Sequence, residues 1–412
     1  MTEGPLEPRR ERALIFLLAA IQFTHITDFV VMMPLGPQFM RVFQLEAQEF
    51  SVLVSAYSVS AAVFSLIAAF FLDRWDRKRS LVWVYLGFVV GTLTCGISHS
   101  YAQLLAGRII AGAFGGTVSA ISFAIIGDVI PAHRRGRAMG ALMASFSVAS
   151  VVGLPAGLFM ASHFGWESVF LGIALMGCGL CLYAYSRVPS LRFHLAAARS
   201  KTLWQEFDEI LRRRACQRGL LFAASVTATG FLIIPFISPS FVANAGVAES
   251  QLSLIYLVGG FCTFFTSQWV GRLSDRWGYR QVFQALALSS LVPIALITNL
   301  GYVGIVWATA VSSLFMVLVS GRMVPSMALL TSLVRPDQRG AFMSLVTFCQ
   351  QIAMGLGSLV AGRLVTVNNG KLLHYNRSGF AAMALTFFAL WLVRSFHSPA
   401  ELAEGVSELH VA

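Results

Sequence analysis

Charged side chains are scarce in this chain. Only 12% of its 412 residues are Asp, Glu, Lys or Arg, whereas 57% are hydrophobic. A water-soluble domain usually carries about 25% charged residues. So few charges do not cover the surface of a soluble globule of this size. The composition therefore excludes an ordinary soluble protein and predicts a chain whose main solvent is the lipid bilayer.

The chain also lacks the short motifs of common enzymes and pumps. It contains no P-loop, no His-Glu-x-x-His and no Gly-x-Ser-x-Gly pattern, so we expect neither an enzyme nor a self-contained ATP-driven pump. We expect no metal and no cofactor. The net charge of +11 does not indicate nucleic-acid binding, because the basic residues cluster between apolar runs rather than in patches interleaved with aromatic residues.

Long apolar runs fill most of the sequence, and about 20 apolar residues are needed to cross a bilayer as a helix. We count spans at roughly 13–36, 50–72, 80–98, 102–127, 138–161, 167–186, 218–242, 251–273, 281–299, 303–332, 341–365 and 378–396. Lys and Arg gather on alternate connecting segments. By the positive-inside rule both termini are then cytoplasmic.

The longest connection, 187–217, divides the chain into an N-terminal unit (1–186) and a C-terminal unit (218–412) of six spans each. Within this connection Leu203, Phe207, Ile210 and Leu211 are spaced to share one face of a helix. The sequence thus predicts an amphipathic helix. Two roles stay open for it: a helix lying on the inner leaflet beside anionic lipid, or a tether between the two units.

The two units carry an internal repeat. Asp73-Arg74-Trp75 recurs as Asp275-Arg276-Trp277 at an offset of 202 residues, and Arg135-Gly136 recurs as Arg339-Gly340 at an offset of 204. Units repeated in parallel orientation are related by an axis along the membrane normal, with the substrate cavity between them. The expected fold is an all-α membrane protein of twelve transmembrane helices in two six-helix bundles related by a pseudo-two-fold axis.

The repeated segment resembles a known signature. Asp73, Arg77 and Lys78 resemble the Gly-x-x-x-Asp-x-x-Gly-Arg-Lys motif of the major facilitator superfamily. The second copy of the segment, with Gly271, Asp275, Gly278 and Arg280, resembles the second copy of that motif. Arg108-Ile109-Ile110-Ala111-Gly112 and Gly153-Leu154-Pro155-Ala156-Gly157 resemble the motifs of its twelve-span drug:proton antiporter branch, which includes bacterial sugar-efflux and multidrug-efflux permeases.

This resemblance implies a secondary active transporter in the cytoplasmic (inner) membrane of a bacterium. It would export small organic compounds (drug-like, sugar-like or metabolites) by alternating access, with protons as the coupling ion. An importer or facilitator of a nutrient on the same fold remains the alternative. The partners are then a small-molecule substrate and the lipid bilayer, and we expect a monomer without nucleic acid.

The resemblance also gives roles to the residues of its motifs. Asp73, Arg77, Lys78 and Asp128 would form a cytoplasmic gate, and Gly153, Pro155 and Gly157 would let the fifth span bend and pack closely. A purely topological role for the charges stays open. Ala69 and Asp76 stand where the first signature has glycine. We therefore expect the second copy, around Gly271 and Gly278, to pack more tightly than the first.

One acid stands out by elimination. Of nineteen acidic residues only Asp28 lies well inside a span, and a buried ionisable residue in a membrane helix is costly enough to be a functional candidate. We predict that Asp28 carries the coupled proton; the alternative is a permanent structural ion pair. Arg108 lies at a similar depth, roughly 10–12 Å from the outer surface by helix rise, so the two side chains can meet. His25 shares a face of the same span and is a candidate relay, or a neutral hydrogen-bonding residue.

Arg322 is a second cation deep in a span. It has three alternative roles: binding of an anionic substrate, structural pairing, or capping of a helix disturbed by Pro325. Gln22, Tyr57, Gln350 and Gln351 are candidate cavity contacts, although hydrogen bonds between packed helices explain such residues equally well.

Overall fold

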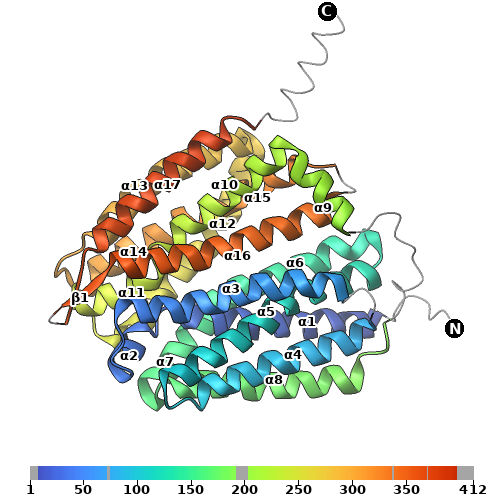
Figure 1. Cartoon of the computed structure of the whole chain (residues 1–412), viewed down its shortest axis with the longest axis horizontal. Coiled ribbons are helices and arrows are strands. Elements are labelled where there is room, and N and C mark those ends of the chain that lie inside the picture. Colours follow the sequence, from blue (N-terminus) through green and yellow to red (C-terminus); the bar gives the residue numbers. More distant parts are fainter. Residues whose placement is uncertain (1–7, 72–74, 192–202, 336–337, 369, 397–412) are drawn as a thin grey trace, which may run out of the picture.

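The computed structural model describes residues 8–71, 75–191, 203–335, 338–368 and 370–396. Within these residues, twelve helical segments are long and apolar enough to cross a membrane, and the chain is almost entirely helical (Figure 1). The predicted all-α fold with twelve spans is confirmed. Its one β element is a short antiparallel hairpin, which the sequence did not predict; it pairs Thr366 with Leu373 and Asn368 with Lys371.

The N-terminal half of the chain forms one bundle. Its elements are α1 (Pro8–Val31), α2 (Gly36–Val42), α3 (Ala47–Phe71), α4 (Arg77–Gly96), α5 (Tyr101–Val129), α6 (Ala132–Val148), the π-helical turn η2 (Ala149–Gly153), α7 (Leu154–Phe164) and α8 (Glu167–Arg187). Within it α4 packs on α5 and α8, and α1 packs on α6. One span is composite, because α6, η2 and α7 run on as a single membrane helix.

The C-terminal half repeats this order. Its elements are α9 (Leu203–Arg212), α10 (Arg214–Phe231), α11 (Ile234–Ala243), the 3-10 turn η4 (Glu249–Gln251), α12 (Leu252–Trp277), α13 (Tyr279–Thr298), α14 (Gly304–Gly321), α15 (Met323–Ser332), α16 (Arg339–Leu364), β1 (Thr366–Asn368), β2 (Lys371–Leu373) and α17 (Tyr375–Val393). Here α12 packs on α14, and α10 packs on α16 and α17. The spans formed by α10–α11 and by α14–α15 are broken in the middle.

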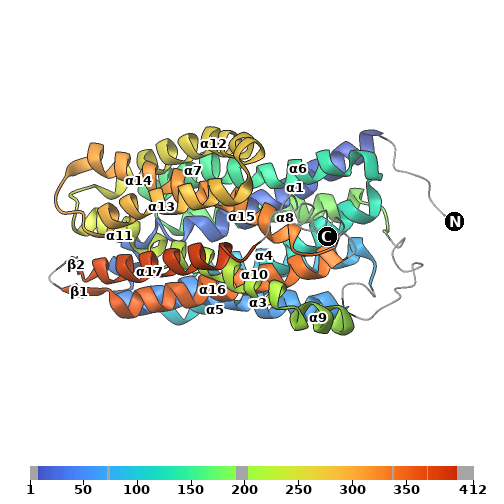
Figure 2. The ribbon, with the colours of Figure 1, turned by 90° about the horizontal axis from the view of Figure 1, so that it is seen from above.

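The two bundles meet where small residues allow close approach. Helix α3 of the first bundle lies along α16 of the second, as Figures 1 and 2 both show. At this contact Gly362 lies against Ser51, and the Ser358 hydroxyl donates to the Ser51 carbonyl at 3.3 Å. A side chain at Gly362 would collide with Ser51, so glycine is needed here for the helices to touch. A second seam joins η2 and α7 to α12.

The helix α9 forms as predicted, but protein covers part of its apolar face. Phe207 and Ile210 are buried in a cluster with core residues of α10 and α16. Gln338, at the start of α16, accepts from Arg213 at 2.8 Å and donates to Glu209 at 3.3 Å. The C-terminal bundle therefore covers Phe207 and Ile210, which argues against lipid contact for this part of the face, whereas Leu211 of the same face is 44% exposed. The tether role remains.

Candidate functional site

Asp28 and Arg108 form an ion pair in the core of the N-terminal bundle. The Arg108 Nη1 and Asp28 Oδ2 atoms are 2.9 Å apart, and both side chains are 0% exposed. The Thr92 hydroxyl, from α4, donates to the other carboxylate oxygen at 3.1 Å. Three helices, α1, α4 and α5, thus supply the carboxylate, the hydroxyl and the guanidinium. The meeting of Asp28 and Arg108 that their depth in the spans predicted is observed.

An aromatic chain runs from this ion pair to the other bundle. The Arg108 Cζ atom lies 4.4 Å from the ring centroid of Tyr57 on α3, a cation–π contact. The Tyr57 ring is 5.1 Å from the ring of Phe29, which in turn is 6.1 Å from the ring of Phe231 on α10. Three rings therefore connect the buried guanidinium with the seam between the bundles.

Several polar atoms around the pair have no hydrogen-bond partner among the described residues. They are His25 Nδ1, Tyr57 Oη and two nitrogen atoms of Arg108, Nε and Nη2. The His25 ring stands edge-on to Phe88 at 5.9 Å and is 6.3 Å from the Tyr57 ring. Histidine is thus close to the pair without bonding to it. A buried cluster with this many unused donors has capacity to bind a further acceptor.

The four remaining cavity candidates lie in three places. Tyr57 belongs to the chain just described. Gln22 is buried and accepts from the Ser119 hydroxyl at 3.0 Å, so it joins α1 to α5 within one bundle. Gln350 and Gln351 lie half-buried on α16, and the Gln351 Oε1 atom is buried without a partner.

Arg322 lies away from that pair, in the C-terminal bundle. It is 1% exposed and occupies the break between α14 and α15. Its guanidinium points toward Ser290 of α13 and the Val226 carbonyl of α10. The backbone carbonyl of Arg322 accepts from the Ser326 hydroxyl at 2.6 Å, a contact that does not involve the guanidinium.

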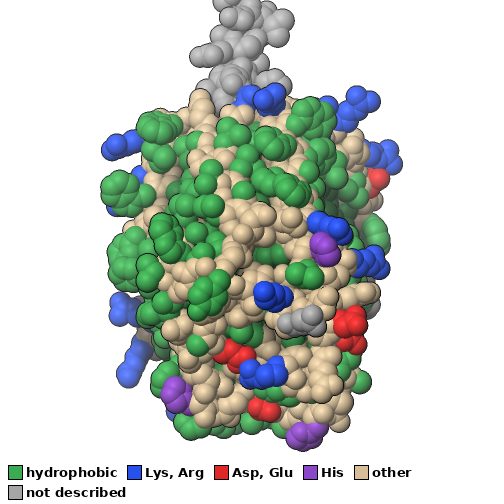
Figure 3. Space-filling view, turned by 90° about the vertical axis from the view of Figure 1, so that its left-hand side faces the viewer, with side chains coloured by type: hydrophobic (Ala, Val, Ile, Leu, Met, Phe, Trp, Pro, Cys, Tyr) green, Lys and Arg blue, Asp and Glu red, His purple; other side chains and the backbone are tan. Residues whose placement is uncertain are grey.

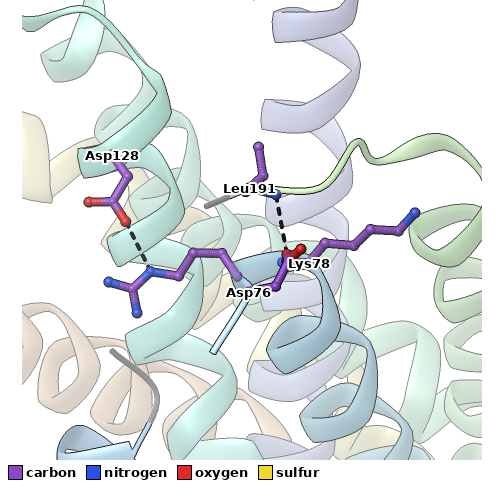
Figure 4. Close-up of polar contacts among 5 residues, drawn as sticks. Asp76, Lys78, Asp128 and Leu191 are labelled. Carbon is purple, nitrogen blue, oxygen red and sulfur yellow. Dashed lines mark hydrogen bonds and ion pairs between the residues drawn. The ribbon is translucent and has the colours of Figure 1, made fainter. Parts of the chain in front are cut away.

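Two acids with different partners hold the start of α4 (Figure 4). Asp128, at the end of α5, accepts from Arg77 Nε at 2.9 Å. Asp76 caps the first turn of α4: it accepts from the Lys78 amide at 2.8 Å and from the Leu191 amide at 3.2 Å, and also bonds the Ser190 hydroxyl. The Lys78 Nζ atom lies 5.7 Å from the Tyr185 ring centroid. Asp73, the remaining gate residue, lies outside the described residues.

The expectation that the second copy of the signature packs more tightly is wrong. At the described positions Asp76 and Arg77 of the first copy are buried, whereas their repeat counterparts Gly278 and Tyr279 are half-buried and exposed. Asp275, whose counterpart Asp73 lies outside the described residues, is exposed and accepts from the Tyr279 hydroxyl at 3.0 Å. Gly271 faces open space. Gly278 is needed for another reason: its φ of +88° at the junction of α12 and α13 is a conformation that favours glycine. The nearby Arg280 lies in the first turn of α13.

The fifth span contains a π-helical turn directly before its proline. The turn ends at Gly153, and α7 begins at Leu154 with Pro155 in its first turn. Proline has no amide proton, so it releases a carbonyl one turn earlier and favours this local widening. A Cβ at Gly153 would lie within 3.1–3.2 Å of the Phe23 ring, and one at Gly157 within 3.1 Å of Val31. Both glycines thus let this span approach α1.

The ends of α2 and α11 close the seam at the end of the molecule opposite the N-terminus (Figure 2). An ion pair between Arg41 and Glu249 joins the two halves there, and the Phe50 and Phe236 rings meet at 5.9 Å. Figure 3 looks onto this end, where acidic and basic side chains are interspersed. At the other end lie the N-terminus, α9 and the basic starts of α4 and α6.

Some of these contacts had no clear signal in the sequence. Thr92 is one of many hydroxyl residues in apolar spans, and Phe29 and Phe231 are two of 33 phenylalanines. The equivalence of Phe29 and Phe231 at the repeat offset of 202 was the available clue, since symmetry-related residues of the first and seventh spans face each other across the seam.

Comparison with known proteins agrees with the fold. A family model described as Major Facilitator Superfamily matches residues 18–358 and, in a second match, residues 220–408. An uncharacterized MFS-type transporter of Bacillus subtilis, YceJ, is 26% identical over 353 residues, 85% of this chain and 88% of that protein. A chloramphenicol resistance protein of Streptomyces lividans is 25% identical over 256 residues, 60% of this chain and 65% of that protein. The crystal structure of a D-xylose-proton symporter superposes with a TM-score of 0.76 at 14% identity, covering 93% of this chain and 97% of that one.

Proposed function

The chain belongs to the major facilitator superfamily of membrane transporters, and we propose that it exports small organic compounds in exchange for protons. The observation that carries this proposal is the ion pair between Asp28 and Arg108, enclosed at 0% exposure in the N-terminal bundle. A membrane helix rarely keeps such charges without a task. A carboxylate that alternates between a proton and a guanidinium is suited to proton coupling.

The chemistry follows from the competition for one carboxylate. When Asp28 is ionised, its charge compensates Arg108 at 2.9 Å. A proton arriving on Asp28 removes that compensation and leaves the buried guanidinium without a counter-charge, which costs several kcal/mol. The protonated state therefore favours a rearrangement that gives Arg108 water or another acceptor. The unused donors Arg108 Nη2 and Tyr57 Oη are where a polar group of the substrate would bind.

The aromatic chain offers a route from this event to the seam. Tyr57 contacts Arg108 through its ring face and also contacts Phe29, which reaches Phe231 in the other bundle. A displacement of the guanidinium changes the packing of Tyr57, and with it the contact between the bundles. Because packed interfaces switch between discrete arrangements, a small shift of this kind biases the relative position of the two halves.

The orientation in the membrane follows from charge. The end with α9 and the basic starts of α4 and α6 is proposed to face the cytoplasm, in the inner membrane of a bacterium, with both termini inside. The Arg41–Glu249 contact then lies on the outer side. Arg77 and Asp128 belong to the same bundle, so we propose that their bond shapes the cytoplasmic gate rather than bridging it.

Two features favour export over import. The Gly153–Gly157 motif with its π-helical turn resembles the antiporter pattern, and one relative is named a chloramphenicol resistance protein. We therefore propose drug-like or sugar-like compounds and metabolites as substrates, with the monomer as the working unit and no cofactor besides the proton.

Reconstituted proteoliposomes test this function. Vesicles with an acidic lumen are offered a panel of labelled compounds that includes chloramphenicol, monosaccharides and small carboxylic acids. Antiport predicts that at least one compound accumulates inside as protons leave. Accumulation only with an alkaline lumen would instead identify a symporter, and equilibration unaffected by the gradient would identify a facilitator. Transport that needs ATP without any gradient would refute secondary transport altogether.

A further inference from the structure

Arg322 is a buried cation without a counter-charge among the described residues. Its side chain is 1% exposed, and no acidic side chain of the described residues pairs with it. The guanidinium makes only two hydrogen bonds, both to neutral oxygen atoms: Ser290 Oγ at 3.5 Å and the Val226 carbonyl at 3.3 Å. Both are longer than the usual range for such bonds. Its Nε atom has no partner.

The contrast with Arg108 is direct. Arg108 is equally buried, but its Nη1 atom bonds an ionised carboxylate at 2.9 Å. At the repeat offset of 202, Asp28 corresponds to Gly230 and Arg108 to Ala310, so Arg322 is a separate arginine of the C-terminal half and not the repeat copy of Arg108. The C-terminal bundle thus keeps an arginine in its core without the acid that compensates the arginine in the other bundle.

An arginine cannot escape this situation by losing its proton, because its guanidinium remains charged in proteins. Leaving a charge buried and uncompensated costs several kcal/mol even after the protein relaxes. A fold that retains such a residue is stabilised when an anion binds beside the guanidinium. The break of the span at Arg322 adds to this, since interrupted membrane helices commonly border ion and substrate sites.

We propose that Arg322 is the centre of an anion-binding site inside the C-terminal bundle. The guanidinium fork, with its free Nε–H, would hold a small singly charged anion, assisted by the Ser290 hydroxyl. Two sources supply this chemistry: chloride from solution, or the carboxylate of a transported compound. Only the second source rests on the proposed export function.

Thermal unfolding of the full-length protein in detergent micelles tests the site without any proton gradient. Chloride and acetate are each titrated at constant ionic strength against a bulky sulfonate. We expect the unfolding midpoint of the wild type to rise and saturate with at least one of the two anions. A rise with chloride alone identifies an inorganic ion, and a rise with acetate identifies a carboxylate site.

Variants locate the effect. Arg322→Gln should abolish the saturable rise, and Arg322→Lys, which keeps the charge without the fork, should weaken anion binding by roughly tenfold. Arg363→Gln removes an exposed arginine at the end of α16 and should titrate like the wild type. Ser290→Ala keeps the cation and should weaken binding several-fold.

If Arg322→Gln does not fold, equilibrium binding of radioactive chloride and acetate to the wild type decides the question. A wild type with no saturable response to either anion would overturn the site, as would an undiminished response in Arg322→Gln. Neither result bears on proton exchange at Asp28, which is measured separately in vesicles.

Discussion

Replacing Asp28 by asparagine removes one negative charge from the core of the N-terminal bundle and leaves the volume of the side chain nearly unchanged. The amide oxygen can still accept from the Thr92 hydroxyl, which now donates to the carboxylate at 3.1 Å. Arg108 loses the partner of its 2.9 Å bond at a site with 0% exposure. Removing one member of a buried ion pair typically costs about 3–5 kcal/mol. We therefore expect a clear loss of thermal stability together with loss of proton-driven transport.

The double variant Asp28→Asn with Arg108→Gln separates the two effects. Removing both charges abolishes the buried, uncompensated cation, so most of the lost stability should return; neutral replacements of buried pairs are often tolerated. Proton coupling should not return, because no carboxylate remains to take the proton. Thr92→Val is the matched control, since it removes only one hydrogen bond to Asp28, worth about 1 kcal/mol.

The assays are a thermal unfolding curve of the purified protein and compound accumulation in vesicles with an acidic lumen. The proposal predicts that the double variant is nearly as stable as the wild type and inactive with a gradient. Asp28→Asn that keeps full gradient-driven accumulation would refute Asp28 as the proton carrier. A structural ion pair predicts the opposite pattern, in which the double variant regains both stability and transport.

Three further outcomes follow from other contacts. Gly278→Ala forces a side chain into a φ of +88° and should cost about 1–3 kcal/mol in unfolding experiments, whereas Gly271→Ala, in open space, should be neutral or stabilising. Reversing the charge of Arg41 should shift the conformational equilibrium toward the state that is open at the α2–α11 end, by a free energy of about 0.2–1 kcal/mol, as for an exposed ion pair. The measurement is the distance between spin labels on α2 and α11. Reversing the charge of Glu249 as well should restore the wild-type distance. Asp76→Gly should loosen the segment after α8, seen as faster amide exchange at Leu191, and an Asp76→Asn variant whose Leu191 amide exchanges as slowly as in the wild type would contradict the need for a charged acceptor.

Much of the fold was predictable because it depends on patterns repeated along the chain. Twelve apolar runs of sufficient length produce twelve membrane helices. The repeat at an offset of 202 residues indicated that the second half follows the helix order of the first. The depth of Asp28 and Arg108 was predictable from helix rise alone. Their contact also requires that α1 and α5 pack together, which the structure shows and the repeat alone does not imply.

The remaining features depend on local geometry that periodicity does not encode. The hairpin of β1 and β2 is fixed by Asn244, whose side chain exchanges two hydrogen bonds with Leu372, 128 residues away. The docking of Phe207 and Ile210 of α9 looked like membrane binding, since an apolar helix face reads the same whether protein or lipid covers it. Asp76 broke the glycine pattern, yet a φ of −56° and three acceptor contacts make it suited to its position.

The two bundles share their helix order but not their charges, and this difference assigns them different tasks. In the N-terminal bundle the acid and arginine satisfy each other, so the event that disturbs them must be a proton or a competing acceptor. In the C-terminal bundle no acidic side chain of the described residues pairs with Arg322. A negative charge that compensates its guanidinium must therefore come from a bound anion. If both proposals hold, proton arrival releases an acceptor-binding group in one half, while an anion stabilises the other half. An exported compound with a carboxylate would then contact both halves, and its export should fall in Arg322→Gln more than that of a neutral compound.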